Sequence, residues 1–321
     1  MSQVSSSQRA AGRLRIPTQP SAGGRRASTQ PSRRSIGRIV AWVYVAIILI
    51  VTIFPFYWIL RTGLSSNDAL SVKPQSLWPV GFTLNGFERV LGLVHGNATG
   101  TVSALDTGDF LLYLRNSTLY AALMTAFVVF FSTTAAYAFA RLHWRGRNLM
   151  FSLFLVALMV PGIMTMLPNF VLIKDLGLLN TIPGLILPGA LFSAFDVFFL
   201  RQFMLGLPNE IDDAARIDGA GPIKALFRVT IPMTAGPITT LSILTFINTW
   251  NEYFWPLLVT NDKSTEPLTV GLASFQQNAP TVAPDWSGLM AATLVSALPM
   301  LVVFVIFGRR IINSIGFTGI R

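Results

Sequence analysis

Cysteine is absent from the 321-residue chain, and histidine occurs only twice. Without thiolates, the chain can build neither a disulfide framework nor a cysteine-based metal or nucleophilic site. His95 and His143 are far apart in sequence, which argues against a zinc site or a histidine-based catalytic triad. The phosphate-binding pattern G-x-x-x-x-G-K-[ST] is also missing. We predict no catalytic residue, no metal site, no cofactor bound by this chain and no enzymatic activity.

Charged side chains are scarce as well. They make up 12% of the residues, against 52% hydrophobic residues, and the mean hydropathy is +0.57. The apolar runs are long enough to cross a bilayer as helices. The pattern predicts an all-α membrane protein with six transmembrane helices, which span residues 39–60, 112–140, 148–168, 182–205, 236–259 and 287–307.

Positive charge is unevenly distributed along the chain. The formal net charge is +10, and eight arginines precede residue 39 with no acidic residue among them. The Ser- and Arg-rich composition predicts a disordered tail over 1–38, ahead of a transmembrane domain over 39–321. The turn 141–147 also carries three arginines and no acid, whereas the predicted outer loop 61–111 is nearly neutral and the predicted outer loop 260–286 is acidic. By the positive-inside rule both termini are cytoplasmic, and the basic tail is a membrane feature that requires no nucleic acid partner.

A polar segment, 208–232, separates the fourth and fifth apolar segments. A helix is predicted to start at Asn209, the expected N-cap, and Asp212 completes a pattern like a capping box. Gly219 allows the chain to reverse, and Pro222 suits the first turn of a second helix. The pattern predicts two short helices joined by a sharp turn. We refer to this segment as the 208–232 loop.

The 208–232 loop resembles the "EAA" signature of the membrane subunits of bacterial ATP-binding-cassette (ABC) importers. Asp213-Ala214-Ala215 is followed after three residues by Gly219 and later by Val229-x-Ile231-Pro232. Asp213 stands where the family usually has glutamate, so the charge is kept. Further matches extend the resemblance to the maltose-permease-like carbohydrate branch over 39–321: Arg115-Asn116-Ser117, the run Ala136–Arg141, Arg145-Gly146-Arg147, Leu176-Gly177-Leu178 and Thr249-Trp250-Asn251-Glu252.

This resemblance implies a MetI-like type I importer fold with a cytoplasmic coupling helix in the 208–232 loop. It implies a homologous second permease subunit, two ATPase subunits that carry ATP-Mg, an extracytoplasmic solute-binding protein, membrane lipid, and a sugar or related solute as cargo. The chain would be a multi-pass protein of the bacterial plasma (inner) membrane. The residues implied to contact the ATPase are Asp213, Ala214, Ala215, Asp218, Gly219 and Ala220. Those implied to contact the binding protein are Ser274, Phe275 and Gln276.

Polar residues at membrane depth are candidates for the translocation path. Asn248, Asn251 and Glu252 share one face of the predicted fifth helix, and Trp250 and Tyr253 lie close by. Aromatic faces beside amide and carboxylate groups suit a sugar, which presents apolar ring faces and hydroxyls. An interfacial belt of aromatic residues explains the same pattern equally well.

Other interpretations stay open at this point. Asp196 is an isolated acid in the fourth segment, where a structural partner such as Arg201 is as reasonable as a contact with substrate. An ion-driven secondary carrier would usually show internal repeats and intramembrane ion-coupling residues, but we find no clear repeat and few intramembrane acids. A membrane scaffold or sensor would need no polar lining. An ABC permease for an amino acid or an anion is a further alternative, although no basic cluster at membrane depth suggests an anion site.

Overall fold

The computed structural model describes residues 34–93, 109–191, 193–277 and 285–316, and every regular element in these ranges is a helix. The described chain divides into two compact units, Met1–Val51 and Thr52–Arg321, and the boundary falls inside helix α1 (Arg34–Gly63). The described side chains of the first unit, from residue 37 on, are exposed and mainly apolar. Most of the predicted tail, 1–33, lies outside the described residues.

Three helices are long and apolar enough to cross a membrane without interruption. They are Gly37–Gly63 of α1, all of α4 (Asp109–Arg141) and Trp286–Gly308 of α15 (Trp286–Gly316). They coincide with the predicted first, second and sixth spans. Many of their large apolar side chains are exposed in the isolated chain, which is the condition expected of helices that face lipid.

Three further helix pairs reach the length of a span only if each bent pair is counted as one. The chain bends by 100° between α5 (Arg147–Ala157) and α6 (Gly162–Asp175), and by 50° between α7 (Ile182–Ala190) and α8 (Ala194–Leu205). A third bend of 80° separates the helical segment Pro222–Met233 from α12 (Ala235–Trp250). The described residues therefore contain three continuous spans, or up to six with the bent pairs.

The helices predicted over 148–168, 182–205 and 236–259 are each interrupted in the structure. Pro161 explains the first break, because it lacks a backbone N–H and disfavours helical geometry in the residue before it. It lies in the extended region, with φ −60° and ψ 131°, and α6 begins directly after it. In the fifth predicted span, α12 ends at Trp250 and a separate short helix, α13 (Phe254–Val259), follows.

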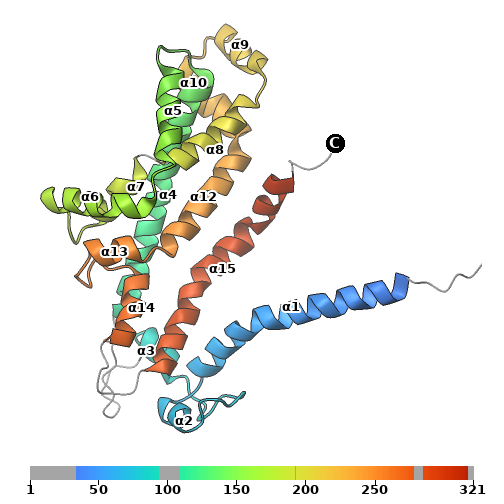
Figure 1. Ribbon diagram of the computed structural model, residues 1–321, viewed down its shortest axis with the longest axis vertical. Coiled ribbons are helices and arrows are strands. Elements are labelled where there is room, and N and C mark those ends of the chain that lie inside the picture. The colour runs from blue at the N-terminus through green and yellow to red at the C-terminus, as the bar shows by residue number, and fades with distance from the viewer. Residues whose placement is uncertain (1–33, 94–108, 192, 278–284, 317–321) are drawn as a thin grey trace, which may run out of the picture. The chain divides into compact units, whose positions relative to one another are not determined.

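Helix α4 is the central element of the second unit. It packs side by side with α8 and α12 (Figure 1) and also contacts α7. Ala121 and Ala136 on α4 are fully buried, and small residues of this kind let neighbouring helices approach closely. At one end of α4, Tyr137 packs with Leu200 of α8 and Leu241 of α12 in one apolar cluster. The packing of α4 against α8 and α12 determines where the candidate functional residues on these helices lie.

The predicted loop 61–111 contains helical structure that its composition did not reveal. Helix α1 continues to Gly63, and two short helices follow, α2 (Asn67–Val72) and α3 (Asn85–Val90). Residues 94–108 lie outside the described residues. Both helices are only six residues long, so hydrophobic periodicity gives almost no signal for them.

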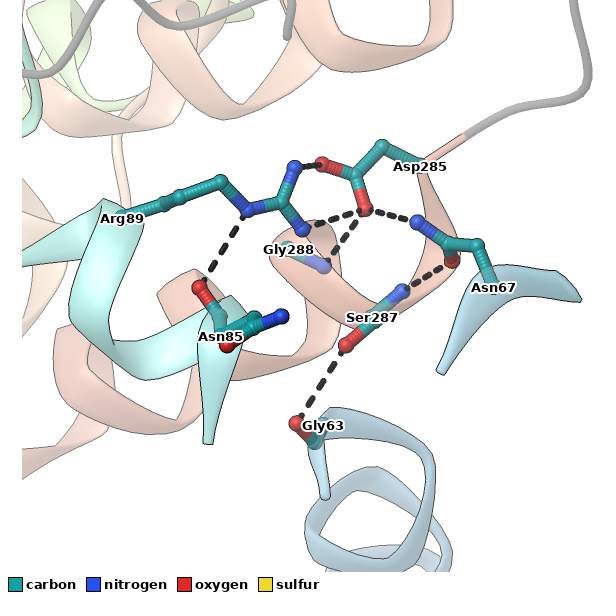
Figure 2. A network of polar contacts seen from close by, with 7 residues as sticks. All are labelled: Gly63, Asn67, Asn85, Arg89, Asp285, Ser287 and Gly288. Atoms are coloured by element: carbon teal, nitrogen blue, oxygen red, sulfur yellow. Dashed lines mark hydrogen bonds and ion pairs between the residues drawn. The ribbon is translucent and has the colours of Figure 1, made fainter. Parts of the chain in front are cut away.

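A polar network fastens α2 and α3 to the start of α15 (Figure 2). The Arg89 guanidinium donates to both carboxylate oxygens of Asp285, over 2.6 and 3.1 Å. The Asn67 amide donates to Asp285 over 2.6 Å and accepts from the backbone N–H of Ser287 over 3.0 Å. Because the Arg89–Asp285 ion pair is bidentate, it fixes the orientation of α3 relative to the start of α15 as well as the distance between them.

Candidate functional site

The 208–232 loop folds as two short helices around a tight turn, α9 (Asn209–Ile217) and α10 (Pro222–Ala225), as the sequence predicts. A π-helix, η1 (Leu226–Thr230), and a last turn, α11 (Ile231–Met233), then lead to the 80° bend before α12. Helical π-segments are rare and occur often at functional sites. The loop is thus joined to the membrane helix α12 by an irregular, bent connection.

Gly219 ends α9 in a left-handed conformation, with φ +71°. The N–H of Ala220 donates to the carbonyl of Ala215 over 2.8 Å, and the N–H of Gly219 donates to the carbonyl of Arg216 over 3.0 Å. This is the hydrogen-bond pattern of a Schellman C-cap, in which a left-handed glycine satisfies the last helix carbonyls. The turn therefore depends on a backbone conformation that β-branched residues strongly disfavour.

The start of α9 differs from the prediction. The N-cap is Pro208, which has no side-chain capping bond, and Asn209 is the first helical residue. The predicted capping role of Asn209 and Asp212 is therefore wrong. Both side chains turn instead toward a residue on another helix, Arg141 at the end of α4.

Arg141 anchors the base of the 208–232 loop. Its guanidinium donates to the Leu207 carbonyl over 2.7 Å and to the Asn209 side-chain oxygen over 3.1 Å, and it forms a 3.0 Å ion pair with Asp212. The Arg141 side chain is only 5% exposed, and Asp212 is 20% exposed. One buried cation therefore connects the turn after α4 with the first turn of α9. The Ala136–Arg141 run carries this residue, but its partners could not be read from the sequence.

The tip of the 208–232 loop is exposed, in contrast to its base. Asp213 is exposed and pairs with Arg216 on the same helix over 3.8 Å, a surface contact of little energetic weight. Of the other residues predicted to contact an ATPase, Ala215 is buried and Ala220 is half-buried. The remaining ones are exposed: Ala214, Asp218 and Gly219. Ile217, at 86% exposed, adds an apolar group that the prediction did not include.

A cavity of about 380 Å³ lies among α4, α7, α8 and α12. Two of the residues predicted for the translocation path, Asn248 and Glu252, line it, and Asp196 joins them from α8. Tyr120, Met124 and Val128 of α4 also line it, four residues apart on one face of that helix. The complete lining is Tyr120, Met124, Val128, Gly189, Ser193, Phe195, Asp196, Leu241, Leu244, Thr245, Asn248, Thr249 and Glu252.

The other three residues predicted for the path do not line this cavity. Trp250 is buried in the core, where its ring stacks on Phe246 with centroids 5.8 Å apart. Asn251 is exposed and donates to the Ile247 carbonyl of its own helix over 2.8 Å. Tyr253 packs edge-on against its neighbour Phe254. Helix α12 ends at Trp250, so Asn251 and Tyr253 lie in the turn that follows it.

Asp196 is not paired with Arg201, the structural partner that the sequence suggested. The Arg201 guanidinium lies over the Phe151 ring, 3.9 Å from its centroid, and donates to the Phe139 carbonyl over 3.3 Å. Asp196 instead accepts a hydrogen bond from Ser193 at the start of α8. The carboxyl group is therefore part of the cavity wall. Two sets of residues at helical spacing in the sequence could have indicated this cavity. They are Leu241, Thr245, Asn248 and Glu252, and Tyr120, Met124 and Val128 of α4.

The Arg115-Asn116-Ser117 motif holds the segment that follows α13. The buried Asn116 amide donates to the carbonyls of Ser264 and Glu266, over 2.9 and 3.0 Å. The Ser117 hydroxyl accepts from the N–H of Leu268 over 2.7 Å, at the first residue of α14 (Leu268–Gln277). Burial raises the pKa of the Glu266 carboxyl group, which also takes part in a hydrogen bond with Tyr113.

Helix α14 includes the predicted binding-protein contacts Ser274, Phe275 and Gln276, whose side chains lie outside the described residues. The helix lies close against α4. A Cβ at Gly271 would come within 2.5 Å of the Tyr113 ring. The start of α14 is thus fixed by contacts with α4.

Replacing Asn116 with alanine is expected to release this segment, because it removes the buried amide that donates to the carbonyls of Ser264 and Glu266. Each lost hydrogen bond costs about 0.5–1.5 kcal/mol. Hydrogen exchange of the amides in 264–273 should rise by roughly tenfold or more. The matched control is Thr118→Ala, since Thr118 is exposed and bonds only to the Leu114 carbonyl of its own helix. Equal exchange in the two variants would show that Asn116 does not hold the segment.

The fold and the cavity together define a class, a multi-helix membrane protein that offers a polar cavity and no nucleotide-binding loop. A family model described as "Binding-protein-dependent transport system inner membrane component" matches residues 129–315. The chain belongs to this family. It is a membrane-embedded translocation subunit, which excludes the ion-driven carrier and the scaffold, and it is not an enzyme.

Individual relatives cover almost the whole chain. The sulfoquinovosyl glycerol transport system permease protein SmoH of Agrobacterium fabrum is 31% identical over 297 residues, 92% of this chain and 98% of the relative. The diacetylchitobiose uptake system permease protein NgcG of Streptomyces coelicolor is 30% identical and covers 83% of each chain. Among solved structures, a chain of a bacterial ABC transporter involved in the import of the acidic polysaccharide alginate matches with TM-score 0.73 at 24% identity. It covers 87% of this chain and 98% of that one, and it shows that the fold is MetI-like.

Proposed function

We propose that this chain is one of two homologous permease subunits in an ATP-driven importer of a saccharide or saccharide derivative, in the bacterial inner membrane. Two ATPase subunits would bind ATP-Mg, and an extracytoplasmic binding protein would deliver the solute. The printed names of the relatives support a saccharide cargo, since sulfoquinovosyl glycerol, diacetylchitobiose and alginate are all sugar compounds.

Six spans with both termini in the cytoplasm follow if each bent helix pair crosses the membrane once. Two observations support this orientation. The 141–147 turn carries three arginines and no acid, which favours the cytoplasmic side. Arg141 in this turn is bonded to Asp212, so the 208–232 loop lies at the same end of the helices. The loop would then face the compartment in which ATP is hydrolysed.

The geometry of the 208–232 loop is the main support for the proposed coupling to an ATPase. Its base is fixed to α4 by Arg141, whereas Asp213, Ala214 and Gly219 at its tip are exposed. A rigidly mounted helix with a free, partly acidic tip is suited to transmit the movement of a partner protein. Asp213 would pair with a basic group of the ATPase, and Ala214 would permit close approach.

Deletion of this chain tests the proposal in its native host. We expect loss of uptake of one saccharide, restored by the wild-type chain, and co-purification of an ATPase with the tagged wild-type protein. Uptake should be sensitive to vanadate and insensitive to an uncoupler in cells whose ATP level is maintained. Uptake that follows the ion gradient, or an assembly that never includes an ATPase, would refute the importer role.

A further inference from the structure

The charged side chains that line the cavity among α4, α7, α8 and α12 are all acidic. Asp196 on α8 and Glu252 in the turn after α12 contribute two carboxyl groups. No lysine, arginine or histidine is present among the described residues that line the cavity. The other polar groups are hydroxyls and one amide, on Tyr120, Ser193, Thr245, Thr249 and Asn248.

Both carboxyl groups keep capacity to accept further hydrogen bonds. Glu252 accepts one hydrogen bond, from the N–H of Trp255 over 3.3 Å, and Asp196 accepts one from Ser193. A carboxylate has about four lone-pair sites, so each retains room for further donors. Neither group takes part in an ion pair among the described residues, because the described salt bridges involve other acids. The cavity wall therefore offers acceptors and no fixed positive charge.

Family membership leaves the charge of the cargo undecided. Sulfoquinovosyl glycerol carries a sulfonate and alginate is an acidic polysaccharide, whereas diacetylchitobiose is neutral. Phosphate, sulfonate and carboxylate groups are normally met by arginine, lysine or clustered N–H donors. Sugar hydroxyls are donors as well as acceptors, and they can satisfy carboxylates without any charge on the sugar.

We propose that the cargo is a neutral, hydroxyl-rich saccharide, and that Asp196 and Glu252 are specificity-determining residues of this subunit. They accept hydrogen bonds from sugar hydroxyls and repel an anionic solute in the low-dielectric cavity. Phe195 supplies an exposed ring beside them, against which an apolar sugar face can pack. This inference rests on the proposed importer function and names the substrate class of the same cavity.

The absence of cysteine allows the charge of the cavity to be measured directly. Thr245→Cys places the only thiol of the chain on the cavity wall, in a side chain no larger than the one it replaces. The complete importer, reconstituted in proteoliposomes, is treated with a cationic and an anionic methanethiosulfonate reagent, in the presence and absence of nucleotide. Mass spectrometry of this chain then gives both rates. Glutathione, which carries a net negative charge, gives a stringent reference ratio of the two reagents.

We expect the ratio of cationic to anionic rate to exceed that of glutathione by about tenfold or more, since a charged cleft concentrates counter-ions to that degree. In the background of Asp196→Asn and Glu252→Gln the ratio should fall toward that of glutathione, because both amides keep an acceptor oxygen and lose the charge. A ratio at or below that of glutathione would overturn the inference. So would a thiol that neither reagent modifies in any nucleotide state.

Uptake by the same proteoliposomes, supplied with the binding protein, separates this inference from the importer function. Diacetylchitobiose and an alginate disaccharide are matched in ring number and differ in charge. Uptake that favours the neutral disaccharide supports the inference, whereas equal or faster uptake of the anionic one overturns it and leaves the importer function intact. Preferential uptake of a cationic solute such as a polyamine would also overturn it. ATP hydrolysis that never responds to the binding protein would contradict the importer function itself.

Discussion

Arg141→Met is expected to lower solute uptake by at least tenfold while the chain still inserts in the membrane. Removing one partner of a buried ion pair costs about 3–5 kcal/mol, because the remaining charge is left without compensation. The cost falls on the base of the 208–232 loop, where Arg141 bonds to Leu207, Asn209 and Asp212. Methionine keeps much of the apolar volume of arginine, so the loss measures the polar contacts rather than a void.

Three measurements identify the effect of Arg141→Met as a loss of positioning. Hydrogen exchange in 209–217 should rise, the ATP hydrolysed per solute transported should rise, and Arg141→Lys should restore activity only in part. Lysine carries the charge but cannot reach three acceptors with a planar fork. Arg145→Met is the matched control, because Arg145 is exposed in the same turn. Wild-type uptake and exchange in Arg141→Met would exclude this role.

A double-mutant cycle makes the assignment of Arg141 sharper. If the Arg141–Asp212 pair carries the effect, Asp212→Asn combined with Arg141→Met should cost less than the sum of the two single changes. Additive losses would show instead that Arg141 acts mainly through the Leu207 carbonyl and Asn209.

Gly219→Val is expected to produce the second large loss of uptake. A left-handed conformation costs an L-residue about 1–2 kcal/mol, more for a β-branched one, and Gly219 has φ +71°. No atom lies within 4 Å of a Cβ added at this position, so the effect comes from the backbone rather than from a clash. The turn between α9 and α10 should open, and association with the ATPase should weaken while insertion is unchanged.

Two matched variants distinguish backbone strain at Gly219 from the mere addition of a side chain. Gly219→Asn should remain near wild-type activity, because asparagine tolerates the left-handed region. Gly221→Ala should be neutral, since Gly221 has an ordinary φ of −67° and open space around it. If Gly219→Val transports as well as Gly219→Asn, the conformation of this turn has no part in coupling.

The sequence predicts two kinds of element well: long apolar segments, and turns that require a residue with an unusual backbone conformation. The three continuous spans have strong hydropathy, and Gly219 lies in the left-handed turn that its position suggests. Hydropathy located neither the break between α5 and α6 nor the end of α12 at Trp250, because it continues through an interruption of the helix. Composition shows that a segment is apolar, but it does not show in which direction the helix axis runs.

The partners of buried polar residues were also beyond prediction, for a different reason. Arg141 and Asp212 are 71 residues apart, and Asn116 reaches carbonyls about 150 residues away. Such contacts depend on which helices lie side by side, and no local pattern encodes that. Asp196 was left without a role for the same reason, although it shares a cavity with Glu252, which follows α12.

Helix α12 has a mechanical consequence. It runs for 16 residues, about 24 Å, from the 80° bend next to the 208–232 loop to the turn that presents Asn248 to the cavity. A regular helix hardly shortens under load, so a push at its first residue arrives at its last residue almost undiminished. Movement of the 208–232 loop would therefore reach the cavity as a displacement of the whole helix rather than as a change in its length.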